Sequence, residues 1–223
     1  MEIATPYGPA LAEVDEAPDP RLLLVLTHGS SGGIDAPDLL AVRDAALKIG
    51  GTVARVVQPF RLRGARAPGS AAKQDEAWLA IVAELRERHP GLPLVQGGRS
   101  NGARVACRTA RAAGATGVIA LAFPLHPPGK PDRSRAGELR QAATPVLVIN
   151  GDRDPFGVPD EADAARLVVL PGEGHELKKD PALVGEEVAR WLPELLETAA
   201  RGSGGVDGHV GGAVRGDDAA VGK

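Results

Sequence analysis

The chain has 223 residues, of which 43% are hydrophobic, and its 26 basic and 29 acidic side chains leave a formal net charge of -3. This near-neutral balance argues against nucleic-acid binding, which needs a Lys and Arg excess on one face, and no apolar run approaches the roughly 20 residues of a membrane helix. Because Cys107 is the only cysteine and no export signal begins the chain, we predict a cytoplasmic protein without an intramolecular disulfide.

Hydrophobic periodicity predicts an α/β protein. The first twenty residues, centred on Tyr7-Gly8-Pro9, predict an antiparallel edge hairpin. From Leu22 to Leu196, short apolar runs then alternate with stretches of helical period, which is typical of a mostly parallel sheet with helices on both faces. The predicted strands are 22–26, 52–57, 92–96, 117–122, 145–149 and 166–170. The predicted helices are 37–49, 74–88, 101–113, 134–142 and 181–198.

The length predicts a single folded domain over residues 1–200. Residues 201–223 are rich in Gly and contain no Leu, Ile or aromatic residue, so we predict a disordered tail there. The intervals between successive predicted strands hold little beyond one helix each. We therefore expect no inserted cap domain and an open site.

A nucleophile motif follows the third predicted strand of the parallel series. In such a sheet the ligand crevice lies beyond the carboxyl ends of the strands. There Gly98, Ser100 and Gly102 match G-x-S-x-G. A serine on a sharp strand-to-helix turn takes a strained backbone conformation, and glycines on either side remove clashing side chains. The motif predicts Ser100 as a nucleophile; the alternative is a Gly-rich turn in which Ser100 caps the helix.

An acid and a base follow the next strands in the order that a catalytic triad needs. Asp154 follows strand 145–149 and His175 follows strand 166–170, so Ser100, Asp154 and His175 have the chain order Ser-Asp-His. A histidine that removes the serine proton, oriented by a carboxylate, would activate Ser100. Asp152 is the competing acid, although it suits a hydrogen bond to the turn backbone better.

Small residues after the first core strand predict an oxyanion hole. The segment Thr27-His28-Gly29-Ser30-Ser31 lets main-chain N–H groups point into the crevice. We expect the amides of Ser30 and Asn101 to be the two donors, with Ser31 as the alternative to Ser30. No phosphate-binding glycine motif is present.

Cationic side chains are expected around the same crevice. Arg61 and Arg63 follow the second core strand, Arg99 precedes the nucleophile, and His126 and Lys130 follow the strand 117–122. Arginine pairs with carboxylate and phosphate oxygens, so this set predicts a preference for small anionic esters. The alternative is that these charges are solvated in loops.

Five segments together resemble a known family. They are THGSSGG, GGRSNGARVACR, FPLHPPGKPDRSRAGELR, NGDRDPFG and GEGHEL. This combination resembles the compact, dienelactone-hydrolase-like branch of the α/β-hydrolases, and especially the bacterial relatives of an animal testis-expressed protein and of a subunit of a nuclear lysine-acetyltransferase complex. The resemblance covers about residues 20–196.

The resemblance implies a serine hydrolase. It assigns Ser100 as nucleophile, Asp154 as acid and His175 as base, and it implies that no metal or organic cofactor is used. Dienelactone hydrolase itself has a cysteine nucleophile, so its substrate does not carry over to a chain with Ser100. We therefore predict a serine esterase acting on a small acyl substrate. The rival hypothesis is a hydrolase-fold binding module without catalysis.

Overall fold

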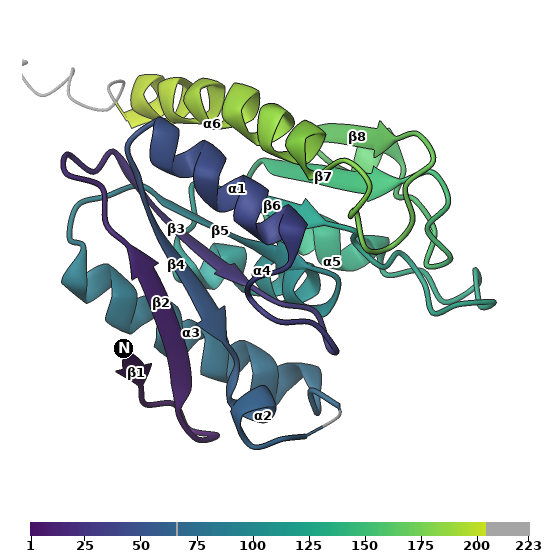
Figure 1. Cartoon of the computed structure of the whole chain (residues 1–223), viewed down its shortest axis with the longest axis horizontal. Helices are drawn as coiled ribbons and strands as arrows, with labels where there is room; N and C mark the ends of the chain where they lie inside the picture. The colour runs from purple at the N-terminus through teal and green to yellow at the C-terminus, as the bar shows by residue number, and fades with distance from the viewer. Residues whose placement is uncertain (66, 204–223) are drawn as a thin grey trace, which may run out of the picture.

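The computed structural model describes residues 1–65 and 67–203, which form an α/β fold around one eight-stranded sheet (Figure 1). The strand order is β1-β2-β4-β3-β5-β6-β7-β8. The strands are β1 (Glu2–Ile3), β2 (Ala10–Asp15), β3 (Leu22–Thr27), β4 (Gly51–Val57), β5 (Leu94–Arg99), β6 (Gly117–Leu121), β7 (Val146–Gly151) and β8 (Arg166–Leu170). The helices are α1 (Pro37–Lys48), α2 (Pro59–Leu62), α3 (Ala71–Arg88), α4 (Asn101–Ala113), α5 (Ala136–Gln141), the short 3-10 helix η1 (Glu161–Asp163) and α6 (Pro181–Ser203).

The sheet is mostly parallel, as predicted. Strands β3 to β8 pair in parallel, whereas β2 pairs antiparallel with β4 and β1 pairs antiparallel with β2. The predicted edge hairpin is therefore confirmed: β1 and β2 form one margin of the sheet. The sequence did not predict α2 and η1, which have only four and three residues and so carry almost no periodic signal.

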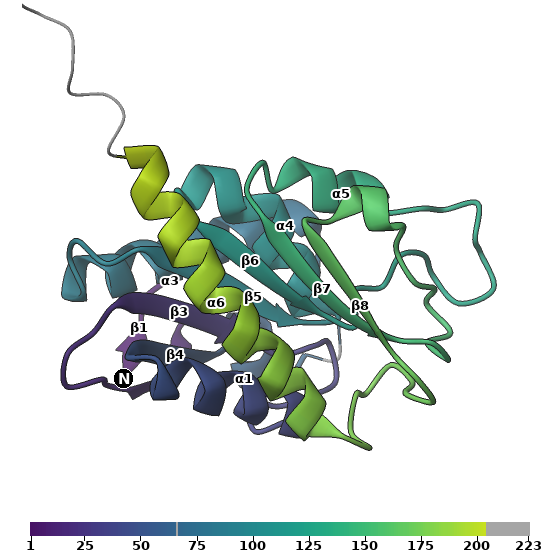
Figure 2. The same cartoon turned by 90° about the horizontal axis from the view of Figure 1, so that it is seen from above.

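Alternating side chains of β3 bury both faces of the sheet. Leu22, Leu24 and Leu26 pack on one face with residues of α1 and α6, while Leu23 and Val25 pack on the other with residues of α3 and α4. Full burial of each such side chain contributes about 1.5–3 kcal/mol. Figures 1 and 2 show α1 and α6 lying side by side on their face. These two layers fix the strands whose ends carry the candidate site.

Strand β5 lies further along the chain than predicted. The sequence places this strand at 92–96, whereas β5 runs through the two glycines to Arg99. A Cβ on Gly97 would lie 2.5 Å from the backbone oxygen of Ile119 on β6. Glycine, which usually weakens a strand, is thus needed here because the neighbouring backbone approaches closely.

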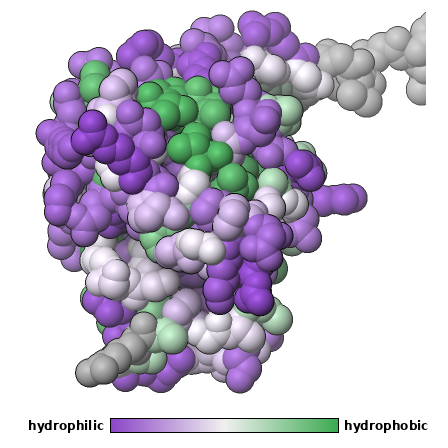
Figure 3. Space-filling view, turned by 90° about the vertical axis from the view of Figure 1, so that its right-hand side faces the viewer, coloured by the Kyte–Doolittle hydropathy of each residue, from purple (hydrophilic) through white to green (hydrophobic). Residues whose placement is uncertain are grey.

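The carboxyl ends of the parallel strands meet at one edge that no separate cap domain covers within the described residues. Figure 3 shows the face toward which β7 and β8 point, where mostly hydrophilic side chains surround a smaller hydrophobic cluster. None of the described helices is long and apolar enough to cross a membrane. Helix α6 continues to Ser203, beyond its predicted end at 198, and residues 204–223 of the predicted tail lie outside the described part.

Candidate active site

Ser100 occupies a strained turn between β5 and α4. Its backbone has φ 54° and ψ -114°, a region that side chains other than glycine rarely adopt. A Cβ on Gly98 would lie 2.6 Å from the backbone oxygen of Thr27, and one on Gly102 would lie 2.7 Å from the same atom. Both glycines are therefore required for β5 and α4 to approach β3, which is the physical reason for the G-x-S-x-G pattern.

The three predicted triad residues meet at this turn. His175 Nε2 lies 2.8 Å from Ser100 Oγ, and His175 Nδ1 lies 2.8 Å from Asp154 Oδ2. The Asp154 side chain is fully buried, and its other oxygen accepts a hydrogen bond of 2.8 Å from the Phe156 backbone N–H. In such a row the carboxylate orients the imidazole, and the imidazole can take the hydroxyl proton.

Asp152, the competing acid, has a different partner. Its Oδ1 accepts a hydrogen bond of 2.7 Å from the backbone N–H of Gly172, and its side chain makes no hydrogen bond to His175 within the described residues. Asp152 therefore ties the end of β7 to the loop that bears His175. The Phe156 ring packs against the His175 ring at a centroid distance of 4.3 Å. Asp154 is the acid that contacts the imidazole.

Ser100 lines a cavity of about 380 Å³, and Ser30 and Asn101 line the same cavity. Within the described residues, the backbone N–H groups of Ser30 and Asn101 donate no hydrogen bond, whereas that of Ser100 is taken by the carbonyl of Leu121 at 2.9 Å. A Cβ on Gly29 would lie 3.2 Å from that of Ser100, so the loop after β3 closely approaches the turn that holds Ser100. Two residues with unused N–H donors thus line the cavity of Ser100, where the sequence predicts an oxyanion hole.

His28 holds that loop in place and is no rival to His175. Its Nε2 accepts a hydrogen bond of 3.1 Å from the Gln58 backbone N–H, and its Nδ1 lies 2.7 Å from the carbonyl oxygen of Gly29. The backbone N–H of Gln58 can only donate, so His28 Nε2 carries no proton. The ring proton is therefore on Nδ1, and the ring is neutral. Burial lowers the pKa of His28, and the Arg61 charge adds to this effect.

The structure gives Arg99 a role other than the predicted one. Although Arg99 lines the cavity, its Nε lies 3.0 Å from Asp38 Oδ2 and its Nη2 donates to the carbonyl of His175 at 2.9 Å. The Asp38 side chain is fully buried; burial raises the pKa of this carboxyl, while Arg99 opposes that rise. The guanidinium is therefore committed to internal partners and is not free to bind an anion.

Neither Arg61 nor Arg63 lines the cavity of Ser100. The chain after β4 turns into α2, and Arg61 Nη2 donates to the carbonyl of Ser31, in the loop after β3, at 3.0 Å. Arg63 donates to the backbone carbonyl of Tyr7 in the edge hairpin and lines a different cavity. The prediction that both side chains surround the crevice was wrong, because the turn after β4 directs Arg61 to the backbone of Ser31 and Arg63 to the edge hairpin.

His126 and Lys130 do not line the cavity of Ser100 either. The His126 ring packs against Gly157, where a Cβ would lie 2.5 Å from Nε2, and its Nδ1 lies 2.9 Å from the carbonyl of Pro127. Lys130 is exposed in the following loop. The predicted contribution of this loop to substrate binding therefore does not come from these two residues.

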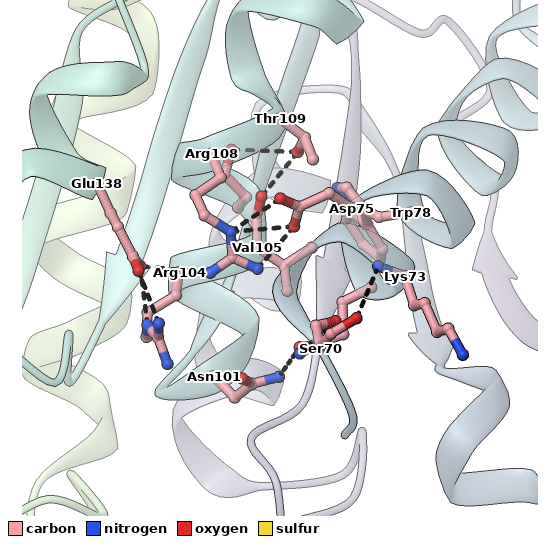
Figure 4. A network of polar contacts seen from close by, with 12 residues as sticks. Ser70, Lys73, Asp75, Trp78, Asn101, Arg104, Val105, Arg108, Thr109 and Glu138 are labelled. Atoms are coloured by element: carbon pink, nitrogen blue, oxygen red, sulfur yellow. Dashed lines mark hydrogen bonds and ion pairs between the residues drawn. The ribbon is translucent and has the colours of Figure 1, made fainter. Parts of the chain in front are cut away.

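Two arginines that the sequence analysis missed border the cavity instead: Arg104 and Arg135. Arg104 forms paired hydrogen bonds of 2.8 and 2.6 Å to Glu138, as Figure 4 shows. Arg135 donates to the carbonyl of Pro124 at 3.1 Å and, within the described residues, forms no ion pair. Burial lowers the pKa of Arg135, with the neighbouring charge of Arg104 as a second cause. Arg104 stands four residues after Ser100, a helical spacing that could have revealed it.

No cluster of three or more His, Cys, Asp and Glu side chains suited to a metal ion occurs in the described part. The candidate site brings together a hydroxyl, an imidazole and a carboxylate in contact. Unused N–H donors and Arg135, which has no acidic partner among the residues that the structure describes, lie beside them.

Comparison with known proteins agrees with this fold. Est1E from Butyrivibrio proteoclasticus with ferulic acid bound is 19% identical with a TM-score of 0.68, covering 88% of this chain and 99% of that one. The lidless α/β serine hydrolase XC6422 from Xanthomonas campestris is 23% identical with a TM-score of 0.64, and the match covers 86% of this chain and 94% of that one. Dienelactone hydrolase from Anabaena variabilis is 16% identical with a TM-score of 0.68, and the match covers 87% of this chain and 95% of that one.

No curated protein matches the sequence. The family model of the alpha/beta hydrolase domain, however, matches residues 20–180, which hold all of β3 to β8 and the candidate triad. The chain therefore belongs to the α/β-hydrolase family.

Proposed function

We propose that the protein is a serine esterase that cleaves small esters through an acyl-enzyme on Ser100. Asp154 orients His175, and His175 acts as the base. The observation that carries this proposal is the continuous hydrogen-bonded row from Asp154 through His175 to Ser100, which ends in an open cavity. The strained backbone of Ser100 supports the proposal further, because such strain clusters at active sites.

The reaction would proceed in two halves. His175 Nε2 takes the proton of Ser100 as Oγ bonds to the ester carbonyl carbon, and the amides of Ser30 and Asn101 stabilise the resulting oxyanion. Collapse of this intermediate expels the alkoxide, which His175 protonates. A water then attacks the acyl group while His175 accepts its proton, and the acid leaves with Ser100 restored.

The solved relatives support an esterase of the dienelactone-hydrolase-like branch. Est1E binds ferulic acid, an aromatic carboxylic acid, in one structure, and a dienelactone hydrolase has the same fold. The serine at position 100 separates this chain from cysteine-dependent dienelactone hydrolases. The proposed likeness to bacterial relatives of the animal testis-expressed and acetyltransferase-complex proteins rests on the sequence segments alone. We also place the enzyme in the cytoplasm, because its single cysteine is buried and unpaired.

The cavity suits a small ester that carries a negative charge. Three arginines line it, namely Arg99, Arg104 and Arg135, together with one described acidic side chain, Glu176. Glu176 forms an ion pair with Lys178. The first two arginines are engaged by Asp38 and Glu138, so Arg135 is the cation whose remaining donors face no carboxylate within the described residues. A planar guanidinium can bind a carboxylate through paired N–H groups. We therefore assign anion recognition to Arg135 in place of Arg61, Arg63 and Lys130.

Hydrolysis of 4-nitrophenyl acetate tests the assignment. Ser100→Ala and His175→Ala are each expected to lower kcat on the order of 10³-fold or more, because triad residues act as a unit. Ser31→Ala is the matched control, since it removes another hydroxyl from the same cavity and leaves the backbone unchanged. Wild-type turnover in Ser100→Ala, with a normal melting temperature, would contradict the esterase proposal. No turnover by the wild type on any simple ester would instead favour a binding module.

A further inference from the structure

A second cavity, of about 510 Å³, lies beside the candidate active site and shares no lining residue with it. The edge hairpin, residues 58–63 and 67–69, and the start of α3 surround this cavity. Its volume falls within the range of about 300–1,000 Å³ that small-molecule sites occupy. Arg63, which the sequence singled out but the triad does not use, is one of its lining residues.

The inner wall of this cavity is apolar and well supported. Pro59, Phe60 and Ala77 line it, and all three are buried, with Phe60 only 4% exposed. The Phe60 ring meets the His28 ring edge to face at a centroid distance of 5.6 Å. Because His28 itself is held at both nitrogens, this wall is part of the packed framework. It offers an aromatic or branched aliphatic group a preformed surface.

The mouth of the cavity is positively charged. Arg63 and Lys73 line it, and no acidic side chain of residues 1–65 or 67–203 does. Within the described residues neither cation forms an ion pair: Arg63 donates to the carbonyl of Tyr7, and Lys73 Nζ lies 5.7 Å from the centroid of the Tyr7 ring. A nearby acid, Glu76, is not among the lining residues. Its carboxylate accepts a hydrogen bond of 2.5 Å from the Tyr7 hydroxyl. Two cations above an apolar wall favour an anion with an apolar body.

We propose that this cavity is a second binding site, which takes a small organic carboxylate with an aromatic or branched aliphatic body. The carboxylate would lie between Arg63 and Lys73, and the body would contact Phe60. The site is a neighbour of the triad cavity, because Gln74 of its lining accepts a hydrogen bond of 2.8 Å from the Asn101 side chain (Figure 4 shows Asn101). Binding here requires none of the proposed hydrolytic chemistry.

A direct titration tests this proposal. 4-Phenylbutyrate and its neutral analogue 4-phenylbutanol are titrated into Ser100→Ala protein by calorimetry at low salt, so that turnover has no influence. The carboxylate is expected to bind at least tenfold more tightly than the alcohol, and this ratio is expected to shrink as salt rises. Equal affinity of the two compounds, or no binding of the carboxylate, overturns the proposal.

Variants then locate the site. Arg63→Gln combined with Lys73→Gln is expected to weaken 4-phenylbutyrate binding at least tenfold, whereas Arg63→Lys, which keeps the charge, is expected to lose less than the double variant. Both side chains are exposed, so we expect the melting temperature of the double variant to stay unchanged. An unchanged melting temperature excludes a folding defect as the cause of weaker binding. Arg135→Gln is the matched control in the triad cavity. Loss of binding in Arg135→Gln, with none in the double variant, would place the carboxylate in the triad cavity and refute a second site.

Discussion

Arg99 donates a hydrogen bond of 2.9 Å from Nη2 to the backbone carbonyl of His175. The same guanidinium approaches the buried carboxylate of Asp38 at 3.0 Å. Since Arg99 directly precedes Ser100, one side chain connects the strand of the proposed nucleophile with the loop of the proposed base and with the start of α1. The spacing between Ser100 and His175 therefore depends on a residue that touches neither of their reacting atoms.

This relationship predicts a change in kcat rather than in KM. Arg99→Met is expected to lower kcat for a neutral ester by about 10–100-fold, because a small misplacement of the base has a cost of that order. KM should change less than threefold. Arg111→Met, on the exposed side of α4, is the control. A raised KM with normal kcat would contradict positioning and would restore Arg99 as a substrate-binding residue.

The two acids after β7 should behave differently. Asp154→Asn is expected to lower kcat by several orders of magnitude, because an amide oxygen at this place orients the imidazole less well and does not stabilise its charged form. Asp152→Asn keeps an oxygen that can accept from the Gly172 N–H, so its kcat should stay within about tenfold of wild type. Steady-state hydrolysis of one ester by both variants decides the matter, and the reverse ranking would assign the acid to Asp152.

Substrate charge provides a test of Arg135. At low salt, an ester with a distal carboxylate is expected to have a higher kcat/KM than a neutral ester of equal size, and Arg135→Gln should reduce this preference at least fivefold. Screening by salt should reduce it too. Arg63→Gln is the control, because that residue lines the other cavity. Equal kcat/KM for both esters in the wild type would exclude an anion-binding role for the triad cavity.

The neutral state of His28 predicts a pH effect on stability. Burial lowers the pKa of His28 below its ordinary value of 6.5. Just below pH 6.5, His28 is therefore protonated in the unfolded chain but stays neutral in the folded chain. The stability that neutral His28 contributes is therefore present above about pH 6.5 and is lost as pH falls below it, at up to about 1.4 kcal/mol per pH unit. Urea unfolding of wild type and His28→Gln at pH 7.5 and pH 5.5 measures this term. The loss should be smaller in the variant; an equal loss would show that His28 is not the group responsible.

Local patterns predicted the parts of the site that depend on backbone turns. Ser100 lies where G-x-S-x-G places it, because steric contact between β5, α4 and β3 leaves room only for glycine at positions 98 and 102. The meeting of His175 and Asp154 with Ser100 was predictable from chain order, since parallel strands bring their carboxyl ends to one edge. The family and the mostly parallel sheet were predictable for the same reason.

Long-range side-chain partners were not predictable from the sequence. Nothing near Arg99 in the chain reveals that Asp38 will be buried beside it, and charge alone made Arg99 look available for substrate. Arg135 enters the cavity because the segment between β6 and α5 bends back over Pro124, a path without periodic signal. Arg63 was misplaced because the four-residue helix α2 redirects the chain after β4.

The central claim is that Ser100 is an activated nucleophile. Its most direct test is mass spectrometry of the folded protein after brief treatment with a fluorophosphonate probe, followed by peptide mapping. The claim predicts one adduct per chain, located on Ser100, formed by the wild type and by Ser31→Ala but absent from Ser100→Ala. An unlabelled wild-type protein, or an adduct on a residue other than Ser100, would contradict it.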